Sequence, residues 1–294
     1  MRAARQHEIG GTPTVDEIDS PEGPGLVRVS ASALNPIDVS IGTGRFYGGT
    51  PPTPYAIGSE VIGTTDDGRR VWVRGRCLMA ELVDPGSGWV FDVPDGLSDG
   101  LALASGIAGL TAWLAVSWRA PVRADDTVLV LGASGTLGGT AVQAAKALGA
   151  RRVIGAARRT ENIPAAADEV FDLGSDEEMP AATLIVDGLW GDPLERALAA
   201  AEVGVRVVNL GQSAGPAATL KSAWVRGKVA DILGHSLFSV PAEVAATGYR
   251  ELTEHVRDGR IAFDVETFPL ERIAEAWAKQ ASGSPGAKIV IDSF

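Results

Sequence analysis

Residues Val128–Gly139, VLVLGASGTLGG, are the stretch that decides the expected fold. The apolar run Val128–Leu131 is bounded by glycines, which is typical of a strand buried on both faces of a parallel sheet. Glycines let the backbone turn sharply and approach a ligand closely, and the helix-like segment behind them would offer free N–H groups to an anion. Strand, turn and helix in this order predict a binding site for the pyrophosphate of a dinucleotide. The expected contacts are Gly132, Ala133, Ser134, Gly135, Thr136, Leu137 and Gly138.

The composition describes a two-domain protein without a nucleic-acid partner. A length of 294 residues suggests two domains, and a hydrophobic content of 45% is enough for two sizeable cores. The formal net charge of −11 repels nucleic acid, and no run of Lys or Arg offsets it. Cys77 is the one cysteine, which excludes an internal disulfide framework and a Cys-rich zinc site and fits a reducing compartment.

We expect no targeting or membrane segment in this sequence. The N-terminal residues MRAARQHEIGG lack the apolar core of a signal peptide, and no stretch reaches the roughly 18 apolar residues of a membrane span. The sequence therefore predicts a cytoplasmic protein that has no membrane partner.

The two halves of the chain differ in their expected secondary structure. The first hundred residues predict short strands between Pro/Gly clusters, at 26–30, 61–64, 70–73 and 79–83, followed by a helical segment at 97–116. From residue 127 onward, strands and helices alternate. The strands are expected at 127–131, 152–156, 170–173, 184–187, 206–210 and 229–233, and the helices at 136–148, 193–201 and 242–258. This alternation predicts an α/β fold with a doubly wound parallel sheet, a Rossmann fold.

The end of the chain is expected to return to the first domain. After Gly259, two short strands at 265–268 and 288–291 flank a helix at 270–281. We expect residues 1–115 and 260–294 to form a β-rich domain with the substrate site, and residues 116–259 to form a nucleotide-binding domain inserted into it. Such a layout places a ligand-binding cleft between the two domains.

NAD and NADP can be distinguished at the end of the strand expected at 152–156, the second strand of the predicted parallel sheet. NAD-binding sheets carry an Asp or Glu about 20 residues after the glycines, where its carboxylate bonds the ribose hydroxyls. Here that strand ends at Arg158 and Arg159, with no acid at the position. An acid would repel a 2′-phosphate, whereas a guanidinium forks onto its oxygens. We therefore predict NADPH (NADP+) as the cofactor, the alternative being that the two arginines are only solvated surface charges.

Loops after other strands of the sheet complete the predicted cofactor site, because ligands bind at the carboxyl ends of parallel strands. The expected contacts are Asp187 after the fourth strand, Leu210, Gly211 and Gln212 after the fifth, and Leu237 and Phe238 after the sixth. Taken one at a time, each would be an ordinary loop residue.

These motifs resemble the medium-chain dehydrogenase/reductase superfamily, specifically its zinc-independent quinone oxidoreductase (zeta-crystallin-like) branch. The similarity covers nearly the whole chain, through EGPGLVRVSASALNPIDVSIGTG, PYAIGSEVIG, VFDVPDGLSDGLALASGIAGLTAWLAV, VLVLGASGTLGGTAVQAAKALGARRVIGAARR and the closing GAKIVI. The resemblance implies a GroES-like catalytic domain plus a Rossmann domain, in a dimer or a tetramer. It also implies hydride transfer from NADPH to a quinone or a carbonyl-conjugated double bond.

The resemblance implies site residues as well. It places Asn35 near the nicotinamide and the substrate, and Thr111 near the cofactor. Zinc-dependent relatives carry Cys where this chain has Asn35 and His where it has Ser59. A catalytic zinc needs about three protein ligands, so we expect no metal. Many quinone reductases carry Tyr where this chain has Ser40, and the loop between Val71 and Leu82 is shorter than in relatives, so the resemblance does not identify the substrate.

A hydroxyl or amide near the reduced oxygen would donate a proton or a hydrogen bond during hydride addition. Tyr47, in a glycine-flanked segment that resembles a flexible loop, is the first candidate. Asn35 and Ser40 are further catalytic candidates, and Tyr55, Thr111 and water are alternatives.

Three other polar residues are expected to be structural. Asp38 would bond the backbone near Asn35, and Glu60 would be a hydrogen-bonding acid near the cofactor. Cys77, beside Leu78 in an expected strand, would be a small buried hydrophobe.

The leading hypothesis is an NADPH-dependent, zinc-free reductase of a small-molecule quinone or α,β-unsaturated carbonyl compound. One alternative is an enoyl-thioester reductase of the same superfamily. Another is a non-catalytic NADPH-binding redox sensor or structural protein that uses the fold alone. On the basis of the family, we expect a homodimer through the sheet edge near 229–238.

Overall fold

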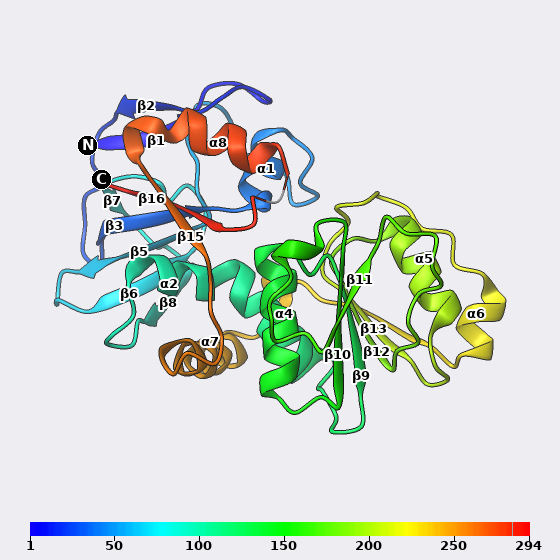
Figure 1. The fold of residues 1–294 in the computed structure, drawn as a ribbon. Coiled ribbons are helices and arrows are strands. Elements are labelled where there is room, and N and C mark those ends of the chain that lie inside the picture. Colours follow the sequence, from blue (N-terminus) through cyan, green and yellow to red (C-terminus); the bar gives the residue numbers. More distant parts are fainter. Residues whose placement is uncertain (284) are drawn as a thin grey trace. The chain divides into compact units, whose positions relative to one another are not determined.

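The computed structural model describes residues 1–283 and 285–294, which form two compact units (Figure 1). Unit 1 consists of Met1–Ile107 and Phe263–Phe294, and unit 2 consists of Ala108–Ala262. Unit 2 is therefore continuous in sequence, whereas unit 1 is assembled from the two ends of the chain.

Unit 1 contains two β-sheets. The smaller one has the order β2 (Thr14–Glu17), β1 (Arg2–Gln6) and β4 (Tyr55–Ala56), with antiparallel pairing. The larger one has the order β15-β16-β3-β5-β6-β8, and β7 pairs with β3. Its strands are β3 (Val27–Leu34), β5 (Glu60–Thr65), β6 (Arg70–Arg74), β7 (Leu82–Val83), β8 (Trp89–Asp92), β15 (Val265–Pro269) and β16 (Lys288–Asp292). The helices of unit 1 are α1 (Pro36–Gly42), α2 (Asp99–Ala104) and α8 (Ile273–Ala281), with a 3-10 turn at Leu270–Arg272.

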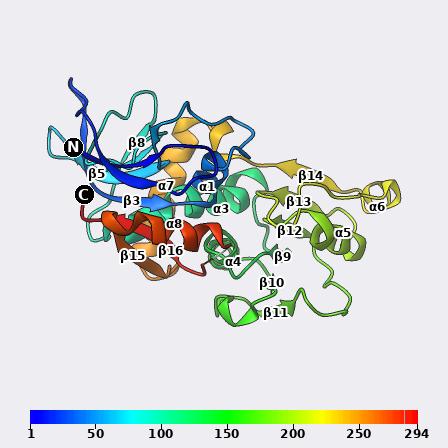
Figure 2. The same ribbon diagram turned by 90° about the horizontal axis from the view of Figure 1, so that it is seen from above.

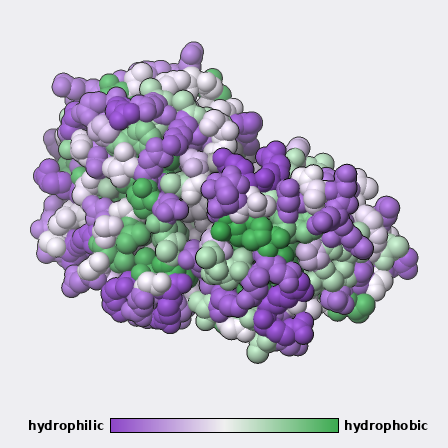
Figure 3. All heavy atoms as spheres, in the orientation of Figure 1, coloured by the Kyte–Doolittle hydropathy of each residue, from purple (hydrophilic) through white to green (hydrophobic). Residues whose placement is uncertain are grey.

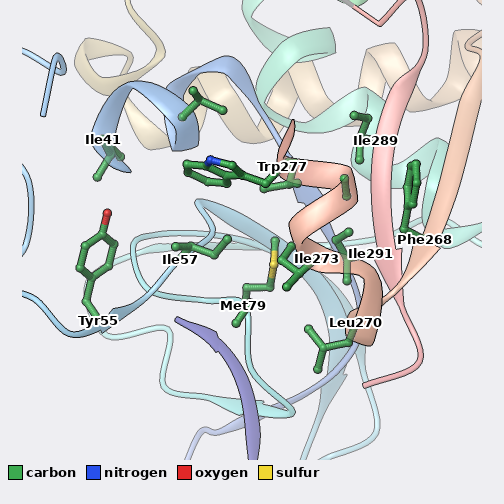
Figure 4. Packing of buried hydrophobic residues seen from close by; sticks show 14 residues of the cluster. Ile41, Tyr55, Ile57, Met79, Phe268, Leu270, Ile273, Trp277, Ile289 and Ile291 are labelled. Carbon is green, nitrogen blue, oxygen red and sulfur yellow. The ribbon is translucent and has the colours of Figure 1, made fainter. Parts of the chain in front are cut away.

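The core of unit 1 joins the first and last segments of the chain (Figure 4). Ile273 and Trp277 of α8 pack with Ile289 of β16 and with Met79, and all four side chains are buried. A Cβ atom on Gly42 would lie 2.7 Å from the Trp277 ring, so the close contact of α1 with α8 requires glycine at this position. The C-terminal segment is thus an integral part of the β-rich unit.

Unit 2 is built on one parallel six-stranded sheet with the order β11-β10-β9-β12-β13-β14 (Figures 1 and 2). The strands are β9 (Thr127–Leu131), β10 (Arg152–Ala157), β11 (Glu169–Asp172), β12 (Leu184–Asp187), β13 (Arg206–Asn209) and β14 (Asp231–Gly234). The helices are α3 (Thr111–Leu114), α4 (Thr136–Ala147), α5 (Gly191–Ala200), α6 (Ser222–Gly227) and α7 (Ala242–Arg257), with 3-10 turns at Thr160–Asn162 and Leu237–Ser239. Every residue of β9 and β12 is buried, as the unbroken apolar runs predict for central parallel strands.

Two expected strands differ in the structure. Of the segment expected at 79–83, only Leu82–Val83 forms a strand, and Ala80 makes a single bridge to Ala3. The sixth strand of the parallel sheet begins at Asp231, not at 229, because Val229 has a φ of +49° and belongs to the preceding turn. Sequence analysis also missed β1 and β2, whose half-polar sequences carry little strand signal.

The helix expected at 97–116 is interrupted. α2 ends at Ala104, a π-helical stretch covers Ser105–Leu110, and Gly106 has a non-helical ψ of −128°. A Cβ atom on Gly106 would lie 2.1 Å from Oε2 of Glu60, so the carboxylate packs directly against the backbone there. This buried contact, which the local sequence does not reveal, accounts for the break in the helix.

One apolar helical segment requires a correction to the sequence analysis. Asp99–Arg119 has the length and composition of a membrane span, although no such stretch was expected. In the structure, 72% of its most apolar window is buried inside the protein, as in a core helix. On the face shown in Figure 3, hydrophilic residues cover more of the surface than apolar residues do.

Candidate functional site

The glycine turn of unit 2 has the geometry of an anion-binding turn. Gly132 has a φ of +85°, and α4 begins at Thr136 with Gly135 as its N-cap. A Cβ atom on Gly138 would lie 2.2 Å from the carbonyl oxygen of Gly132, so the turn can close onto the helix only with glycine at 138. The first N–H groups of a helix have no partner within it, and the Gly135 N-cap has no side chain to accept from them. The turn therefore suits an anionic group. Ala133, Ser134 and Leu137 belong to the same turn and first helical turn.

Two cations lie at the same edge of this sheet. Arg158 and Arg159 directly follow β10, which pairs with β9, and both residues are exposed. The neighbouring strand β11 ends at Asp172, whose carboxylate accepts a hydrogen bond from the N–H of Gly174 at 2.8 Å. The end of β10 thus carries two exposed arginines at the carboxyl edge of the sheet.

The neighbouring strands β12 and β13 each end in a polar residue. Asp187 closes β12 and Asn209 closes β13, and the two residues are register partners. Nδ2 of Asn209 donates to Oδ2 of Asp187 at 2.9 Å and to the carbonyl of Gly211 at 2.8 Å. Oδ1 of Asp187 accepts from the N–H groups of Leu189 and Trp190, both at 2.9 Å. Burial raises the pKa of Asp187, and these donors act against that shift.

The loops after β13 and β14 lie along the same edge. The N–H of Leu210 donates to the carbonyl of Asp187 at 2.7 Å, and a Cβ atom on Gly211 would lie 2.9 Å from the carbonyl oxygen of Gly188. Gln212 is exposed. The 3-10 turn after β14 buries Leu237 and leaves Phe238 42% exposed. These residues border the edge at which the glycine turn opens.

Thr111 and His235 are neighbours in unit 2. Thr111 is buried at the start of α3, and its backbone forms a hydrogen bond with the imidazole of His235. Burial and, after it, the charge of Arg119 lower the pKa of His235 to about 4. The imidazole is therefore neutral at physiological pH.

In unit 1, Asn35 belongs to a buried ionic network. Nζ of Lys288 donates to Oδ1 of Asn35 and to Oε1 of Glu60, both at 2.6 Å, and Nδ2 of Asn35 donates to Oε1 of Glu60 at 3.0 Å. Oε2 of Glu60 accepts from Nε1 of Trp72 and from the N–H of Ile107, both at 2.8 Å. A buried ion pair needs such additional hydrogen bonds to offset its desolvation. The Asn35 amide is thus held rigidly by internal partners.

A second buried group surrounds Asp38. Its carboxylate accepts from the hydroxyl of Ser59 at 2.6 Å and from the N–H of Asn35 at 2.8 Å. Burial nevertheless raises the pKa of Asp38 to about 6. The prediction of a bond from Asp38 to the backbone near Asn35 is therefore confirmed, since this bond caps α1.

A small hollow of about 10 Å³, large enough for about one water molecule, adjoins this group. Its lining includes Asp38, Ser59, Tyr55 and Cys77. The hydroxyl of Tyr55 is buried, has no hydrogen-bond partner among the described residues, and points toward Ile41 in Figure 4. Burial raises the pKa of this hydroxyl to about 12.

The expectation that Cys77 is a small buried hydrophobe is wrong. Cys77 is exposed and has a φ of +61°, because the chain turns between β6 and the buried residue Leu78. Tyr47 is 82% exposed and its ring contacts Phe46, with centroids 4.6 Å apart, while Ser40 is half-buried.

Sequence analysis missed Lys288 and Asn209. A lone lysine inside the apolar run of GAKIVI is a usable signal, because a lysine buried in a strand needs a charged partner. Asn209 ends an apolar strand at the carboxyl edge, and its position adjacent to Asp187 becomes apparent only from the strand order.

Comparison with known proteins agrees with this geometry. Residues 148–291 match the family model described as zinc-binding dehydrogenase. The human quinone oxidoreductase is 27% identical over 325 residues, which cover 99% of this chain and 98% of that protein. The crystal structure of the quinone oxidoreductase from Thermus thermophilus has a TM-score of 0.85 and 25% identity, with full coverage of both chains.

These similarities agree with the predicted resemblance to the medium-chain dehydrogenase/reductase superfamily. The matches that cover nearly all of both chains include quinone oxidoreductases, the branch that the sequence resembles. The predicted combination of a parallel α/β sheet with a β-rich part is also confirmed.

One relative is much longer than this chain. A phenolphthiocerol/phthiocerol polyketide synthase polypeptide of Mycobacterium tuberculosis is 29% identical over 329 residues, and the chain spans only 14% of its length.

Proposed function

We propose that this chain is an NADPH-dependent reductase that transfers a hydride to a quinone or an α,β-unsaturated carbonyl compound. The observation that carries the proposal is the carboxyl edge of the parallel sheet. There the glycine turn suits a pyrophosphate, and Arg158 and Arg159 replace the acid that would bind an NAD ribose. The relative from Thermus thermophilus has been described in complex with NADPH.

The preference for NADPH rests on charge. A 2′-phosphate near the end of β10 would meet two exposed guanidinium groups, which pair with phosphate oxygens in a fork geometry. The nearby carboxylate of Asp172 is engaged by the N–H of Gly174. Replacing both arginines by Ala should raise the Kd for NADPH about 10- to 100-fold and leave the Kd for NADH nearly unchanged.

The matched control for the arginine test is Arg152→Ala. Arg152 lies at the opposite end of β10, is also partly exposed, and pairs with Glu169. This variant should bind both cofactors like the wild type. An equal loss of NADPH and NADH binding in the double variant would contradict the assignment.

The residues at the zinc positions of the superfamily do not fit a catalytic zinc, and we propose that the enzyme works without it. The Asn35 oxygen accepts from the Lys288 ammonium at 2.6 Å, so a cationic group already lies beside this oxygen. Ser59 donates to Asp38. Among the described residues, no group of three or more His, Cys, Asp or Glu side chains could hold a metal ion. Activity should therefore survive dialysis against a strong chelator.

When bound, NADPH supplies the hydride. The chain would contribute a rigid substrate-side scaffold through the Asn35–Glu60–Lys288 network, and hydrogen-bond donors for the oxygen that gains electron density. Tyr47 is the proposed proton donor because its side chain is accessible, with Ser40 and Asn35 as further catalytic candidates. The Asn35 amide is already occupied by Lys288 and Glu60, which favours a positioning role for it.

We further propose a cytoplasmic homodimer. β14 is an edge strand whose Ile232 is 38% exposed, and Val229 and Phe238 beside it are 66% and 42% exposed. Unpaired apolar edge strands readily pair with a second copy. Sedimentation velocity of the wild type and of Ile232→Lys would test this, the variant being expected to sediment as a monomer.

Stopped-flow oxidation of NADPH against quinones, enones and enoyl thioesters tests the reaction itself. Turnover of quinones or enones supports the proposal. The similarity to a stretch of a polyketide synthase favours an enoyl-thioester reductase as the second candidate, which selective turnover of the thioesters would support. Tight NADPH binding with no turnover of any class would indicate the non-catalytic sensor and contradict the proposed activity.

A further inference from the structure

The loop that carries Tyr47 is basic in a chain that is acidic overall. This loop, residues 43–54 between α1 and β4, contains Arg45 and no Asp or Glu. The segment 71–80 likewise contains Arg74 and Arg76 without an acidic residue, although the chain has 37 acidic residues and a net charge of −11. Exposed cations in such a protein create a local positive potential, which attracts anions against the field of the whole molecule.

The structure brings Arg76 onto this loop. One Nη atom of Arg76 donates to the carbonyl of Gly48 at 3.2 Å, and its guanidinium lies 5.9 Å from the centroid of the Phe46 ring. The Phe46 ring in turn contacts the Tyr47 ring, with centroids 4.6 Å apart. Arg45 lies two positions before Tyr47, and both arginines are exposed. Two exposed guanidinium groups therefore belong to the same surface as the side chain proposed as the proton donor.

Neither of these guanidinium groups is paired with a carboxylate in the described part of the chain. Nε of Arg45 donates to the hydroxyl of Thr43 at 3.0 Å, and Arg76 contacts a carbonyl and a ring, so all of these partners are neutral. Elsewhere in unit 1, by contrast, Arg2 pairs with Glu81 at 2.9 Å. A guanidinium has five N–H donors, so both groups keep donors for a ligand.

These groups surround the place where an acceptor would be protonated. An acceptor that takes a proton from Tyr47 must bring its oxygen within hydrogen-bond distance of that hydroxyl. The neighbouring Phe46 ring offers an aromatic surface to a planar molecule. A negatively charged substituent of that molecule would meet a guanidinium, which pairs with carboxylate, sulfonate or phosphate oxygens in a fork geometry.

We infer that the quinone or enone reduced by this protein carries an anionic substituent, which Arg45 and Arg76 recognise. This inference rests on the proposed reductase function and names the class of its acceptor. It makes the two arginines specificity-determining residues, with no part in the hydride or proton transfer itself.

Two matched pairs of acceptors test this inference at saturating NADPH. The enone pair is trans-4-oxo-2-pentenoate and its methyl ester, and the quinone pair is 1,4-naphthoquinone-2-sulfonate and 1,4-naphthoquinone. The measured quantity is the ratio of kcat/KM for the anionic member to kcat/KM for the neutral member. Differences in intrinsic reactivity within a pair cancel when this ratio is compared between proteins.

The ratio should depend on the charge of the two arginines. We expect it to fall about threefold in Arg45→Gln and about tenfold in the double variant with Arg76→Gln, as for exposed ion pairs. The double variant with lysine at both positions keeps the charges and should keep most of the ratio. Arg28→Gln is the matched control and should keep the wild-type ratio, because Arg28 is also exposed but lies in β3, seven positions before Asn35.

Ionic strength gives a second readout, which a purely structural role of the arginines would not change. Raising NaCl from about 20 mM to about 300 mM shortens the Debye length from roughly 20 Å to roughly 6 Å. In the wild type, kcat/KM for the anionic members should fall with salt, because the local attraction is screened. In the double glutamine variant it should rise with salt, because repulsion by the acidic protein is then the effect that is screened.

The following results would overturn the inference. One is a wild-type ratio in the double glutamine variant, including the case in which both members lose activity equally. Another is a wild-type kcat/KM for the anionic members that does not fall with salt, and this result decides even if the double variant fails to fold. A wild type that reduces only the neutral members would overturn the inference and leave the proposed function standing. A wild type that reduces no member of either pair would overturn both.

Discussion

Removing the Lys288 ammonium should expose how strongly unit 1 depends on its buried ionic network. In Lys288→Met, Oε1 of Glu60 loses a donor at 2.6 Å, and Oδ1 of Asn35 loses its donor at the same distance. The side chains of Lys288 and Glu60 are only 3% and 0% exposed, so water cannot replace the ammonium without opening the fold. Breaking a buried pair by removing one partner costs about 3–5 kcal/mol, because an uncompensated charge stays behind.

Two features of the network limit this loss. Glu60 keeps the donors Trp72, Ile107 and Asn35, which still stabilise its carboxylate. Methionine fills most of the volume of the lysine stem, so little cavity cost is added. We therefore expect a loss near the lower end of the range, about 3 kcal/mol.

The assay is urea unfolding followed by tryptophan fluorescence, with Lys279→Met as the matched control. Lys279 pairs with Glu266, also in unit 1, but these side chains are 40% and 38% exposed, so the control should lose less than about 1 kcal/mol. A Lys288→Met variant that loses no more free energy of unfolding than Lys279→Met would refute the reasoning.

Four further predictions concern single residues. Gly138→Ala places a Cβ atom 2.2 Å from the Gly132 oxygen and should raise the Kd for NADPH at least about tenfold. Gly139→Ala is the control, because its added Cβ atom would lie 3.3 Å from the nearest atom, in the Pro164 side chain, and it should bind NADPH normally in the same titration. Burial raises the pKa of Asp38 from 3.8 to about 6, so the native state retains a proton that the unfolded chain has lost in this interval. The free energy of unfolding should therefore fall as the pH rises from about 4 to 6, by at most about 1.4 kcal/mol per unit, and urea unfolding of Asp38→Asn should lack this slope; parallel pH profiles would count against it. Tyr47→Phe should lower kcat by about 100-fold without changing the Kd for NADPH, and an unchanged kcat would exclude Tyr47 as the proton donor. Tyr55→Phe removes a buried hydroxyl that has no hydrogen-bond partner among the described residues. This variant should be at least as stable as the wild type in urea unfolding.

The order of elements in unit 2 could be predicted because each signal is local. Central parallel strands are buried on both faces, so they appear as unbroken apolar runs such as Val128–Leu131. The glycine turn is equally readable, since the close approach of Gly138 to Gly132 excludes any side chain. The arginines after β10 take their meaning from a fixed offset along the chain.

The sequence-based predictions were wrong at the break in the helix, at Cys77 and at the start of β14. The break at Gly106 reflects Glu60, and the exposure of Cys77 reflects a left-handed turn that no local pattern announced. The position of β14 was shifted by two residues because the turn at Val229 interrupts an apolar run.

The sequence by itself determined the parallel sheet, the glycine turn, the charge at the end of β10 and the resemblance to quinone oxidoreductases. The tertiary structure alone revealed that Lys288 and Asn35, 253 positions apart, are hydrogen-bonded to each other and both donate to the carboxylate of Glu60. It alone also revealed that Nε2 of His235 is left without a partner among the described residues. The physical reason is that hydrophobic periodicity and turn chemistry act between near neighbours, whereas the pairing of buried polar atoms depends on which distant strands the fold places side by side.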